Sequence, residues 1–423
     1  MQIIKNIAYL TILLMLTSCC KDENSNPDVL WRNRICGKDL IGDIGPGYPI
    51  YKNTVVFHST PVPGDDDEYS VMHGLDTKTG KEKWRLTVDD FSPKQVLRFS
   101  NSDYYYQHNN IFVGADFQTA SDLKETYIYG VDIDKGRVLW VTEHPRGKQF
   151  GRQVVGSNKT AYVDFQNSST EFSLIGIDIE TGSYAEVFTF TQADIPEAMP
   201  EKSVEFHRMS QVYTNDVGDE FIALSFNGFD YNGTSGKSYM TLFVYNLTQR
   251  QKVYSIYVNP QTPDDGWDGF YGRITYHKGR ILVGKWKYVY CFDAFQEREP
   301  YWVRSTKVSP DPNSSDEVAH MLAYDNAALA FCLGHLAAFD INTGNLLYDS
   351  KTTGTDPNVI DGVIYKKDQG DLQMLDAKTG KELKRVPYGK GEEAFAGARP
   401  NGADGRIYIH TYTDAYCIRA WGR

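Results

Sequence analysis

One pattern of apolar and polar positions recurs along most of the chain. In each copy an apolar run ends at an aspartate or its replacement, a short polar turn follows, and a second apolar run begins near a large aromatic residue. The clearest copy runs from Gly74 to Trp84 and has Asp76, Thr79 and Gly80 at its turn. Apolar runs on both sides of a turn rich in Asp, Thr and Gly predict a β-hairpin.

This hairpin returns every 36 to 68 residues, with a mean spacing of 49. The residue before the aspartate is always large, whereas the residue before that one is mostly small. Adjacent residues of a strand point to opposite faces, so we expect both faces of this strand to be buried between neighbouring sheets. The aspartate or its replacement stands at Asp76, Asp132, Asp178, Asn246, Asp293, Asp340, Asp376 and Arg419.

A second pair of short strands precedes each hairpin, as in residues 51–57, 277–283 and 404–409. Each repeat therefore supplies four strands, and a repeat of about 50 residues is typical of one propeller blade. The predicted fold is an all-β, eight-bladed β-propeller of four-stranded blades over residues 29–423. Seven blades is the alternative, because the copies at Asn246 and Arg419 are degenerate.

The first and last predicted strands of the propeller are expected to belong to the same blade. The last copy stops at Trp421-Gly422-Arg423, which leaves no room for an outer strand, and residues 29–35 form an apolar strand with no copy before it. We expect residues 29–35 to pair with residues 415–421, with Trp31 opposite about Ile418. This pairing would close the ring and remove its exposed sheet edges.

These copies resemble the pyrroloquinoline-quinone-like propeller repeat, in which A-x-D-x-x-T-G-x-x-x-W recurs around an eight-bladed disc. The resemblance covers about residues 29–423 and is most specific in blades one, two, six and seven. Among propeller lipoproteins, the chain is similar to the BamB family of the outer-membrane protein assembly machinery in its N-terminus, repeat type and size. That similarity implies a role in binding and assembly without catalysis.

The same resemblance also raises a quinoprotein dehydrogenase as the less favoured reading. Those enzymes carry adjacent cysteines against the quinone and an acidic calcium site, whereas the adjacent cysteines here, Cys19 and Cys20, lie at the N-terminus. We therefore predict no catalytic residues, no cofactor and no metal. Cys291 and Cys417 occupy small buried positions of the repeat, and the register makes a disulfide between Cys36 and Cys417 improbable.

The N-terminus predicts export and lipidation. Lys5 precedes an apolar run over residues 7–16 that is too short to cross a bilayer, so residues 1–18 are predicted to be a signal peptide. Leu16-Thr17-Ser18-Cys19 resembles a bacterial lipobox, which makes Cys19 the lipidated residue and residues 19–28 a polar tether. Lys21-Asp22-Glu23 is similar to an export signal for the outer cell surface, which leaves the periplasmic and surface-exposed faces of the outer membrane as alternatives.

The charge of the chain narrows the choice of partners. The sequence has 44 basic and 55 acidic side chains, a formal charge of −11, and no basic field for binding phosphates. We exclude nucleic acid and expect outer-membrane or envelope proteins as partners, with a glycan or nutrient as the alternative. Membrane attachment would come from the N-terminal lipid.

An aromatic residue, one spacer and an arginine stand just before the expected inner strand of several blades. In a propeller these positions converge at one mouth of the central channel, where arginines suit an anionic ligand or an acidic partner segment. The alternative is that each arginine pairs with a local carboxylate. The candidate binding residues are Arg152, Arg208, Arg273 and Arg399, with Trp267 and Tyr271 from a long loop of the same face.

Overall fold

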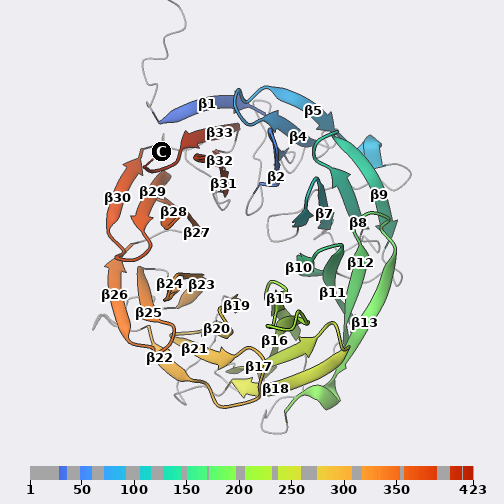
Figure 1. Cartoon of the computed structure of the whole chain (residues 1–423), viewed down its shortest axis with the longest axis vertical. Coiled ribbons are helices and arrows are strands. Elements are labelled where there is room, and N and C mark those ends of the chain that lie inside the picture. The colour runs from blue at the N-terminus through green and yellow to red at the C-terminus, as the bar shows by residue number, and fades with distance from the viewer. Residues whose placement is uncertain are drawn as a thin grey trace, which may run out of the picture.

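The structure is a computed structural model, and its strands form eight separate sheets arranged in a ring around a central axis (Figure 1). Two short 3-10 helices, η1 (Val88–Phe91) and η2 (Gln192–Asp194), follow outer strands. The residues that it describes are 28–35, 48–59, 71–91, 105–115, 127–143, 150–168, 171–196, 205–230, 237–258, 274–306, 317–332, 334–352, 357–387, 401–411 and 413–422.

Each blade has four antiparallel strands from the axis outward. The innermost strands of blades one to eight are β2 (Ile50–Tyr51), β6 (Tyr105–His108), β10 (Phe150–Ser157), β14 (Glu205–Met209), β19 (Ile274–His277), β23 (Val318–Tyr324), β27 (Asn358–Ile360) and β31 (Asn401–Ala403). The second strands are β3 (Thr54–Ser59), β7 (Ile111–Ala115), β11 (Thr160–Ser168), β16 (Glu220–Asp230), β20 (Arg280–Lys285), β24 (Ala327–Cys332), β28 (Val363–Asp368) and β32 (Arg406–His410).

The third and fourth strands form the hairpins that the repeat predicted. The third strands are β4 (Val71–Asp76), β8 (Tyr127–Asp132), β12 (Glu171–Asp178), β17 (Lys237–Asn246), β21 (Tyr288–Asp293), β25 (His335–Asp340), β29 (Asp371–Asp376) and β33 (Asp414–Arg419). The fourth strands are β5 (Glu82–Leu86), β9 (Arg137–Glu143), β13 (Tyr184–Thr191), β18 (Gln251–Val258), β22 (Trp302–Ser305), β26 (Leu346–Lys351), β30 (Glu382–Val386) and β1 (Val29–Arg34).

The predicted eight-bladed propeller is confirmed, and the degenerate copies at Asn246 and Arg419 are true blades. Blade four carries one additional short strand, β15 (Tyr213–Thr214), which pairs with β16. The outer strand of blade eight is β1, so the two ends of the described chain share one sheet. The predicted register is off by one residue, because an irregularity between Val29 and Trp31 sets Trp31 opposite Cys417 instead of Ile418.

The aspartate of the repeat organises its own turn. In blade one a carboxylate oxygen of Asp76 accepts hydrogen bonds from the backbone N–H of Lys78 and Thr79 and from the Thr79 hydroxyl, at 3.1, 2.8 and 2.9 Å. Gly80 follows with a φ of +69°, which a residue with a Cβ adopts only with strain. The Asp-x-x-Thr-Gly pattern is therefore a turn motif with a structural purpose in each blade that carries it.

The aromatic residue of the repeat joins one blade to the next. The Trp84 indole lies over Gly74 of its own blade, and its N–H donates to the carbonyl of Ile133 in blade two at 2.9 Å. A Cβ on Gly136 of blade two would lie 2.1 Å from the indole, so no larger residue fits there. The same donation to the following blade comes from Trp31, Trp140, Trp302 and Tyr348.

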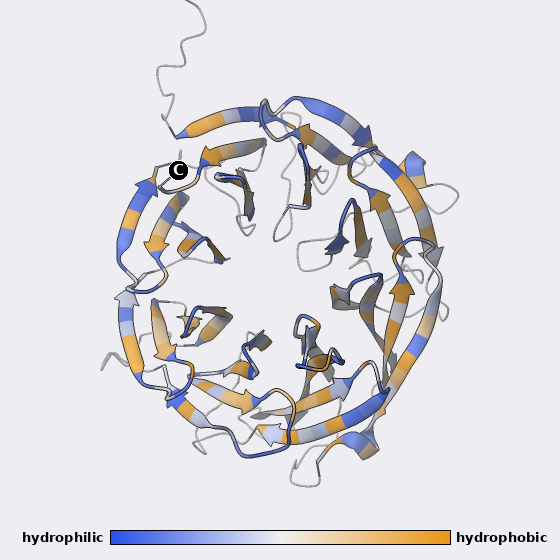
Figure 2. Ribbon diagram, in the orientation of Figure 1, coloured by the Kyte–Doolittle hydropathy of each residue, from blue (hydrophilic) through white to orange (hydrophobic). Residues whose placement is uncertain are grey.

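The hydrophobic core is divided into layers between neighbouring blades. Figure 2 shows hydrophobic residues concentrated along the strands and hydrophilic residues at the turns. Cys291 and Cys417 are fully buried in two of these layers, as predicted, and both are free thiols. Burial of apolar surface between all adjacent blades makes the ring a stiff support.

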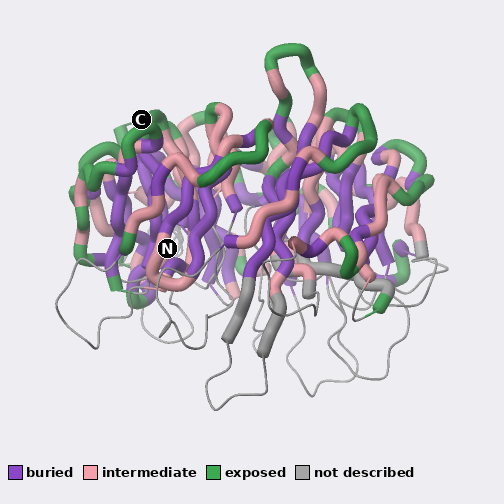
Figure 3. The backbone as a smooth tube through the Cα atoms, turned by 90° about the horizontal axis from the view of Figure 1, so that it is seen from below, coloured by how far each residue is buried: buried purple, intermediate pink, exposed green. Residues whose placement is uncertain are grey.

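The disc has two different faces. The turns that join first to second and third to fourth strands lie together on one side, which we call the turn face, and they are largely exposed (Figure 3). The remaining strand ends lie on the opposite side, which we call the loop face. Because the chain reverses at every strand, all connections between successive blades start from the loop face.

Candidate functional site

Most of the predicted binding residues lie outside the described residues. Arg273, Arg399, Trp267, Tyr271 and the lipidation candidate Cys19 are in this group. The backbone of Arg152 lies in β10, but its side chain is outside the described part. The convergence of these residues at one channel mouth therefore stays a prediction.

The expected position of the aromatic-x-arginine triplets is wrong in blades three and four. Phe150 already pairs with Phe165 in β10, and Phe206 pairs with Phe226 in β14, so both triplets lie inside inner strands instead of ahead of them. Arg208 is half-buried, and its Nε and Nη1 atoms are inaccessible to solvent. In blade four the Phe206 ring stacks on the Phe172 ring, with the ring centres 4.6 Å apart.

The second and third strands of blade four, β16 and β17, form a long hairpin. Residues 231–236 join β16 and β17, whose ladder continues to the pair Asp230 and Lys237. These two strands, of 11 and 10 residues, are the longest of the described strands. Blade four therefore carries its strands further toward the loop face than the other blades do.

Around the channel, polar side chains of one blade form hydrogen bonds with the backbone of the neighbouring blade. The Gln107 amide of blade two bonds to both backbone groups of Ile50 in blade one, at 3.1 and 2.7 Å. The Thr275 hydroxyl of blade five donates to the carbonyl of Met321 in blade six at 2.7 Å. Further hydrogen bonds of this kind between adjacent blades come from Gln153, Gln211 and Asn401. These groups stabilise the ring, so they are not free to bind a ligand in the channel.

Blade seven contains a buried lysine that the sequence analysis did not single out. Lys366 on β28 is 1% exposed, and among the described residues its Nζ has no hydrogen-bond partner. Burial lowers the pKa of Lys366 to about 8, with Asp368 opposing the shift and Arg385 adding to it. The Asp368 carboxylate is instead paired with Arg385, at 2.7 Å. Burial of the charged Lys366 side chain therefore lowers the free energy of unfolding.

Replacing this lysine is expected to stabilise the protein. Lys366→Met keeps the apolar stem and removes the buried charge, so the free energy of unfolding at pH 7 should rise by about 2 kcal/mol. Because the folded pKa lies below that of an unfolded lysine, the parent should gain stability as the pH rises from about 8 to 10.5, and the variant should not. Urea unfolding at pH 7 and pH 9.5 measures both effects.

The adjacent Lys367→Met variant is the control, since Lys367 lies on the opposite face of the same strand and is only half-buried. It should change the unfolding free energy by less than about 0.5 kcal/mol. A destabilised Lys366→Met variant would show that the ammonium has a stabilising partner.

Blade one brings together a serine, a histidine and a glutamate from its three outer strands, β3, β4 and β5. The Ser59 Oγ lies 3.1 Å from Nε2 of His73, and Nδ1 of His73 lies 2.7 Å from a carboxylate oxygen of Glu82. This order of contacts is the one used to activate a serine nucleophile. However, Ser59 and His73 are each only 3% exposed, so a substrate does not reach the hydroxyl in this conformation.

The repeat supplies a structural explanation for this cluster. Gln373 and Glu382 of blade seven occupy the positions of His73 and Glu82, and their side chains are also hydrogen-bonded to each other. Since glutamine cannot act as a general base, the recurring pair serves to join the third and fourth strands of a blade. Aligning the copies of the repeat beyond the hairpin turn would have revealed it.

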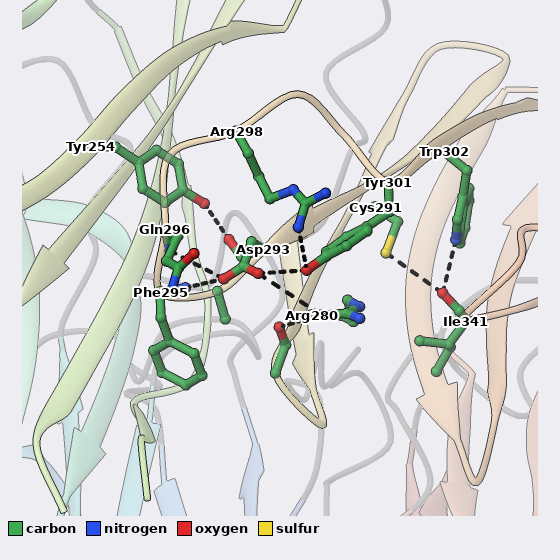
Figure 4. Close-up of polar contacts among 12 residues, drawn as sticks. Tyr254, Arg280, Cys291, Asp293, Phe295, Gln296, Arg298, Tyr301, Trp302 and Ile341 are labelled. Atoms are coloured by element: carbon green, nitrogen blue, oxygen red, sulfur yellow. Dashed lines mark hydrogen bonds and ion pairs between the residues drawn. The ribbon is translucent and has the colours of Figure 1, made fainter. Parts of the chain in front are cut away.

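The turn face of blade five replaces the missing Thr-Gly motif with a tyrosine (Figure 4). The Tyr301 hydroxyl donates to a carboxylate oxygen of Asp293 at 2.6 Å, where other blades use the threonine hydroxyl. The guanidinium carbons of Arg280 and Arg298 lie 3.8 and 4.0 Å from the centre of the Tyr301 ring. Stacked in this way, both arginines are engaged by the ring and by local hydrogen bonds.

Two searches for other chemistry found nothing in the described part of the chain. No group of three histidine, cysteine or acidic residues is arranged there to hold a metal ion. Within the same ranges, no helix has the length and apolar character needed to cross a membrane.

Comparison with known proteins bears out the repeat family. Residues 21–224 match the family model described as outer membrane protein assembly factor BamB, which confirms the resemblance over that part of the chain. A search of curated protein sequences finds no match.

Solved structures share the fold over nearly the whole chain. BamB from Moraxella catarrhalis is 15% identical with a TM-score of 0.57, and the match covers 93% of this chain and 99% of that one. Sqt1 from Saccharomyces cerevisiae is 11% identical with a TM-score of 0.57 and the same coverage. Quinohemoprotein alcohol dehydrogenase from Comamonas testosteroni is 9% identical with a TM-score of 0.58, covering 93% of this chain and 76% of that one. At these identities the likeness shows the fold alone.

Proposed function

We propose that this BamB-like propeller is a lipid-anchored, non-catalytic scaffold that binds envelope proteins at the outer membrane. The observation that carries the proposal is the match of residues 21–224 to the family described as outer membrane protein assembly factor BamB. The dehydrogenase shares the fold, but the adjacent cysteines of this chain lie at positions 19 and 20, ahead of the propeller. A binding role therefore agrees better with the residues present.

In this proposal the turn face and the loop face of the disc have different roles. On the turn face, lysines of neighbouring blades are occupied in ion pairs, such as Lys52 with Asp134 at 3.2 Å and Lys378 with Asp325 at 3.2 Å. From the loop face start the longest connections, including residues 92–104, 259–273 and 388–400. Binding residues concentrate on loops that a rigid scaffold carries, so we assign partner binding to the loop face.

Arginine and aromatic side chains of those connections are the proposed contacts. Arg and aromatic residues dominate the binding energy of many protein interfaces, because they combine apolar area with directed polar groups. An acidic segment of an envelope protein would complement the cations. The residues proposed to contact it are Arg273, Arg399, Trp267 and Tyr271 of the connections, together with Arg152 of β10 and Arg208 of β14 at the inner strands.

The first residue of the described chain indicates where the lipid anchor would join the propeller. Asp28, at the beginning of β1, lies on the outer rim of blade eight, where its carboxylate pairs with Lys384 at 2.5 Å. A lipidated Cys19 would be nine residues away, and an extended segment of that length spans at most about 30 Å. The rim of the disc would therefore stay close to the membrane.

Two cysteine variants test the anchor and the scaffold together. Cys19→Ala should move the protein from the membrane to the soluble fraction, whereas the matched Cys20→Ala variant should remain membrane-bound. Affinity purification of the lipidated protein from gently solubilised membranes should recover an outer-membrane β-barrel or its assembly factors in stoichiometric amounts. Recovery of the propeller alone would contradict the scaffold, and specific retention on a glycan array would then favour the glycan-binding alternative.

A further inference from the structure

A hollow of about 610 Å³ opens on the turn face of blade eight. Its lining residues come from β1, from the turn between β31 and β32, from the end of β33 and from the turn between β27 and β28. Its size falls within the range of pockets that hold small organic ligands. It is lined by Leu30, Asp361, Asp404, Gly405, Arg406 and Arg419.

The hollow exists because blade eight is built from both ends of the chain. In blades one to seven a hairpin turn joins the third strand to the fourth at this position. In blade eight the third strand ends at Arg419, and the fourth strand is β1 from the N-terminal end. Arg419 also replaces the repeat aspartate, so the carboxylate that organises the hairpin turn of other blades is missing from this strand end.

Two arginines meet at this position. Arg406 and Arg419 are direct partners across β32 and β33, a placement that brings like charges together and is unfavourable without an anion. In the corresponding pair of blade five, Arg280 faces Asp293, and their charged atoms lie 4.0 Å apart. Over the described ranges neither Arg406 nor Arg419 has an ion-pair partner, although many lysines of the same face do.

The other residues that line the hollow indicate which chemical groups the anionic ligand has besides its acid group. Asp361 and Asp404 project from the first turns of blades seven and eight, so a bare phosphate would meet repulsion as well as attraction. A ligand with hydroxyl groups opposite its acid group would place an acid near the arginines and hydrogen-bond donors near the carboxylates. Leu30, which is 38% exposed, adds an apolar surface for a ring or carbon chain.

We infer that this hollow binds an acidic sugar, with the carboxylate between Arg406 and Arg419 and hydroxyl groups on Asp361 and Asp404. Arginine suits this task because its planar guanidinium donates two parallel hydrogen bonds to a carboxylate. The sugar acid is either free or a residue of an acidic polysaccharide. The inference is independent of the proposed scaffold, since it concerns the face opposite to the one assigned to protein partners.

The test is calorimetric titration of the full-length protein in detergent with glucuronate, glucose, inorganic phosphate and an oligoglucuronate. Glucuronate should bind, and glucose and phosphate should bind at least tenfold more weakly. Arg419→Asp restores the repeat residue and places a carboxylate opposite Arg406, so it should weaken glucuronate binding at least tenfold without lowering the unfolding midpoint. Tighter binding of the oligomer than of glucuronate would identify a polysaccharide as the source, and equal binding would identify the free acid.

The matched control is Lys81→Asp, which makes the same change in charge at an exposed turn of blade one. It should leave glucuronate binding unchanged. Failure of the parent to bind glucuronate would overturn the inference, as would phosphate binding of equal strength or an Arg419→Asp variant with parental affinity. None of these outcomes affects the membrane and co-purification results that test the scaffold.

Discussion

Replacing Trp302 by alanine is expected to lower the free energy of unfolding by about 3–5 kcal/mol. The Trp302 side chain is 5% exposed, and its indole N–H donates to the carbonyl of Ile341 in blade six at 2.8 Å. A Cβ on Gly344 would lie 2.7 Å from the ring, so the indole fills the space above that glycine completely. Alanine would leave a cavity between blades five and six, and the Ile341 carbonyl would keep only the weak Cys291 thiol donor at 3.7 Å. The urea unfolding midpoint measures the loss.

The control for this variant is Tyr184→Ala in blade three. Tyr184 also stands at the start of an outer strand, but it is 42% exposed and is not clamped against a following blade. Its removal should cost less than about 0.5 kcal/mol. Equal losses for the two variants would show that the aromatic bridge between blades contributes nothing beyond strand propensity.

Acidification is expected to destabilise the protein through His58. Burial lowers the pKa of His58 to about 3, and the neighbouring His73 adds to the shift. A histidine in the unfolded chain has a pKa near 6.5. In this pH range the imidazole is protonated in the unfolded state but not in the folded state. The free energy of unfolding therefore falls as the pH drops from 6.5 toward 3. Between pH 6.5 and pH 4 the expected loss is about 3 kcal/mol.

A phenylalanine at position 58 should remove this part of the acid sensitivity. The His58 ring already lies 6.3 Å from the Phe112 ring of blade two, so an aromatic ring without a titrating nitrogen suits the same layer. Urea unfolding of parent and His58→Phe at pH 7 and pH 4 gives the difference. The control is His108→Phe at a half-buried position, and a parental pH dependence in His58→Phe would contradict the assignment.

The fold could be predicted from the sequence because the residues that form each turn are close together in the chain and recur from blade to blade. Asp76, Thr79 and Gly80 form one turn by contacts within five residues, and the same turn returns in other blades. The blade with the weakest pattern was also correctly included, since Arg419 still ends a strand. The closing register was missed by one residue because the irregularity near Val29 leaves no mark in the sequence.

The polar contacts between blades could not be predicted, because each joins side chains of different blades and no repeat pattern marks them. Thr352 of blade six, for example, donates to Gln373 of blade seven at 2.8 Å. Lys366 looks like an ordinary surface lysine until its strand is placed between two blades. The positions of Arg152 and Arg208 were misjudged by a few residues, because β10 and β14 begin at or before the aromatic residue of each triplet.

The sequence by itself determined the repeat, the four strands of each blade, the closure of the ring and the alternation of large and small residues. These features depend on turn chemistry and on side-chain alternation, which act over a few residues. Only the tertiary structure decided which side chains meet: the aromatic bridges between blades, the buried lysine, and the arginine pair beside an open hollow. Those contacts depend on the packing of sheets that are distant in the chain, so no local pattern encodes them.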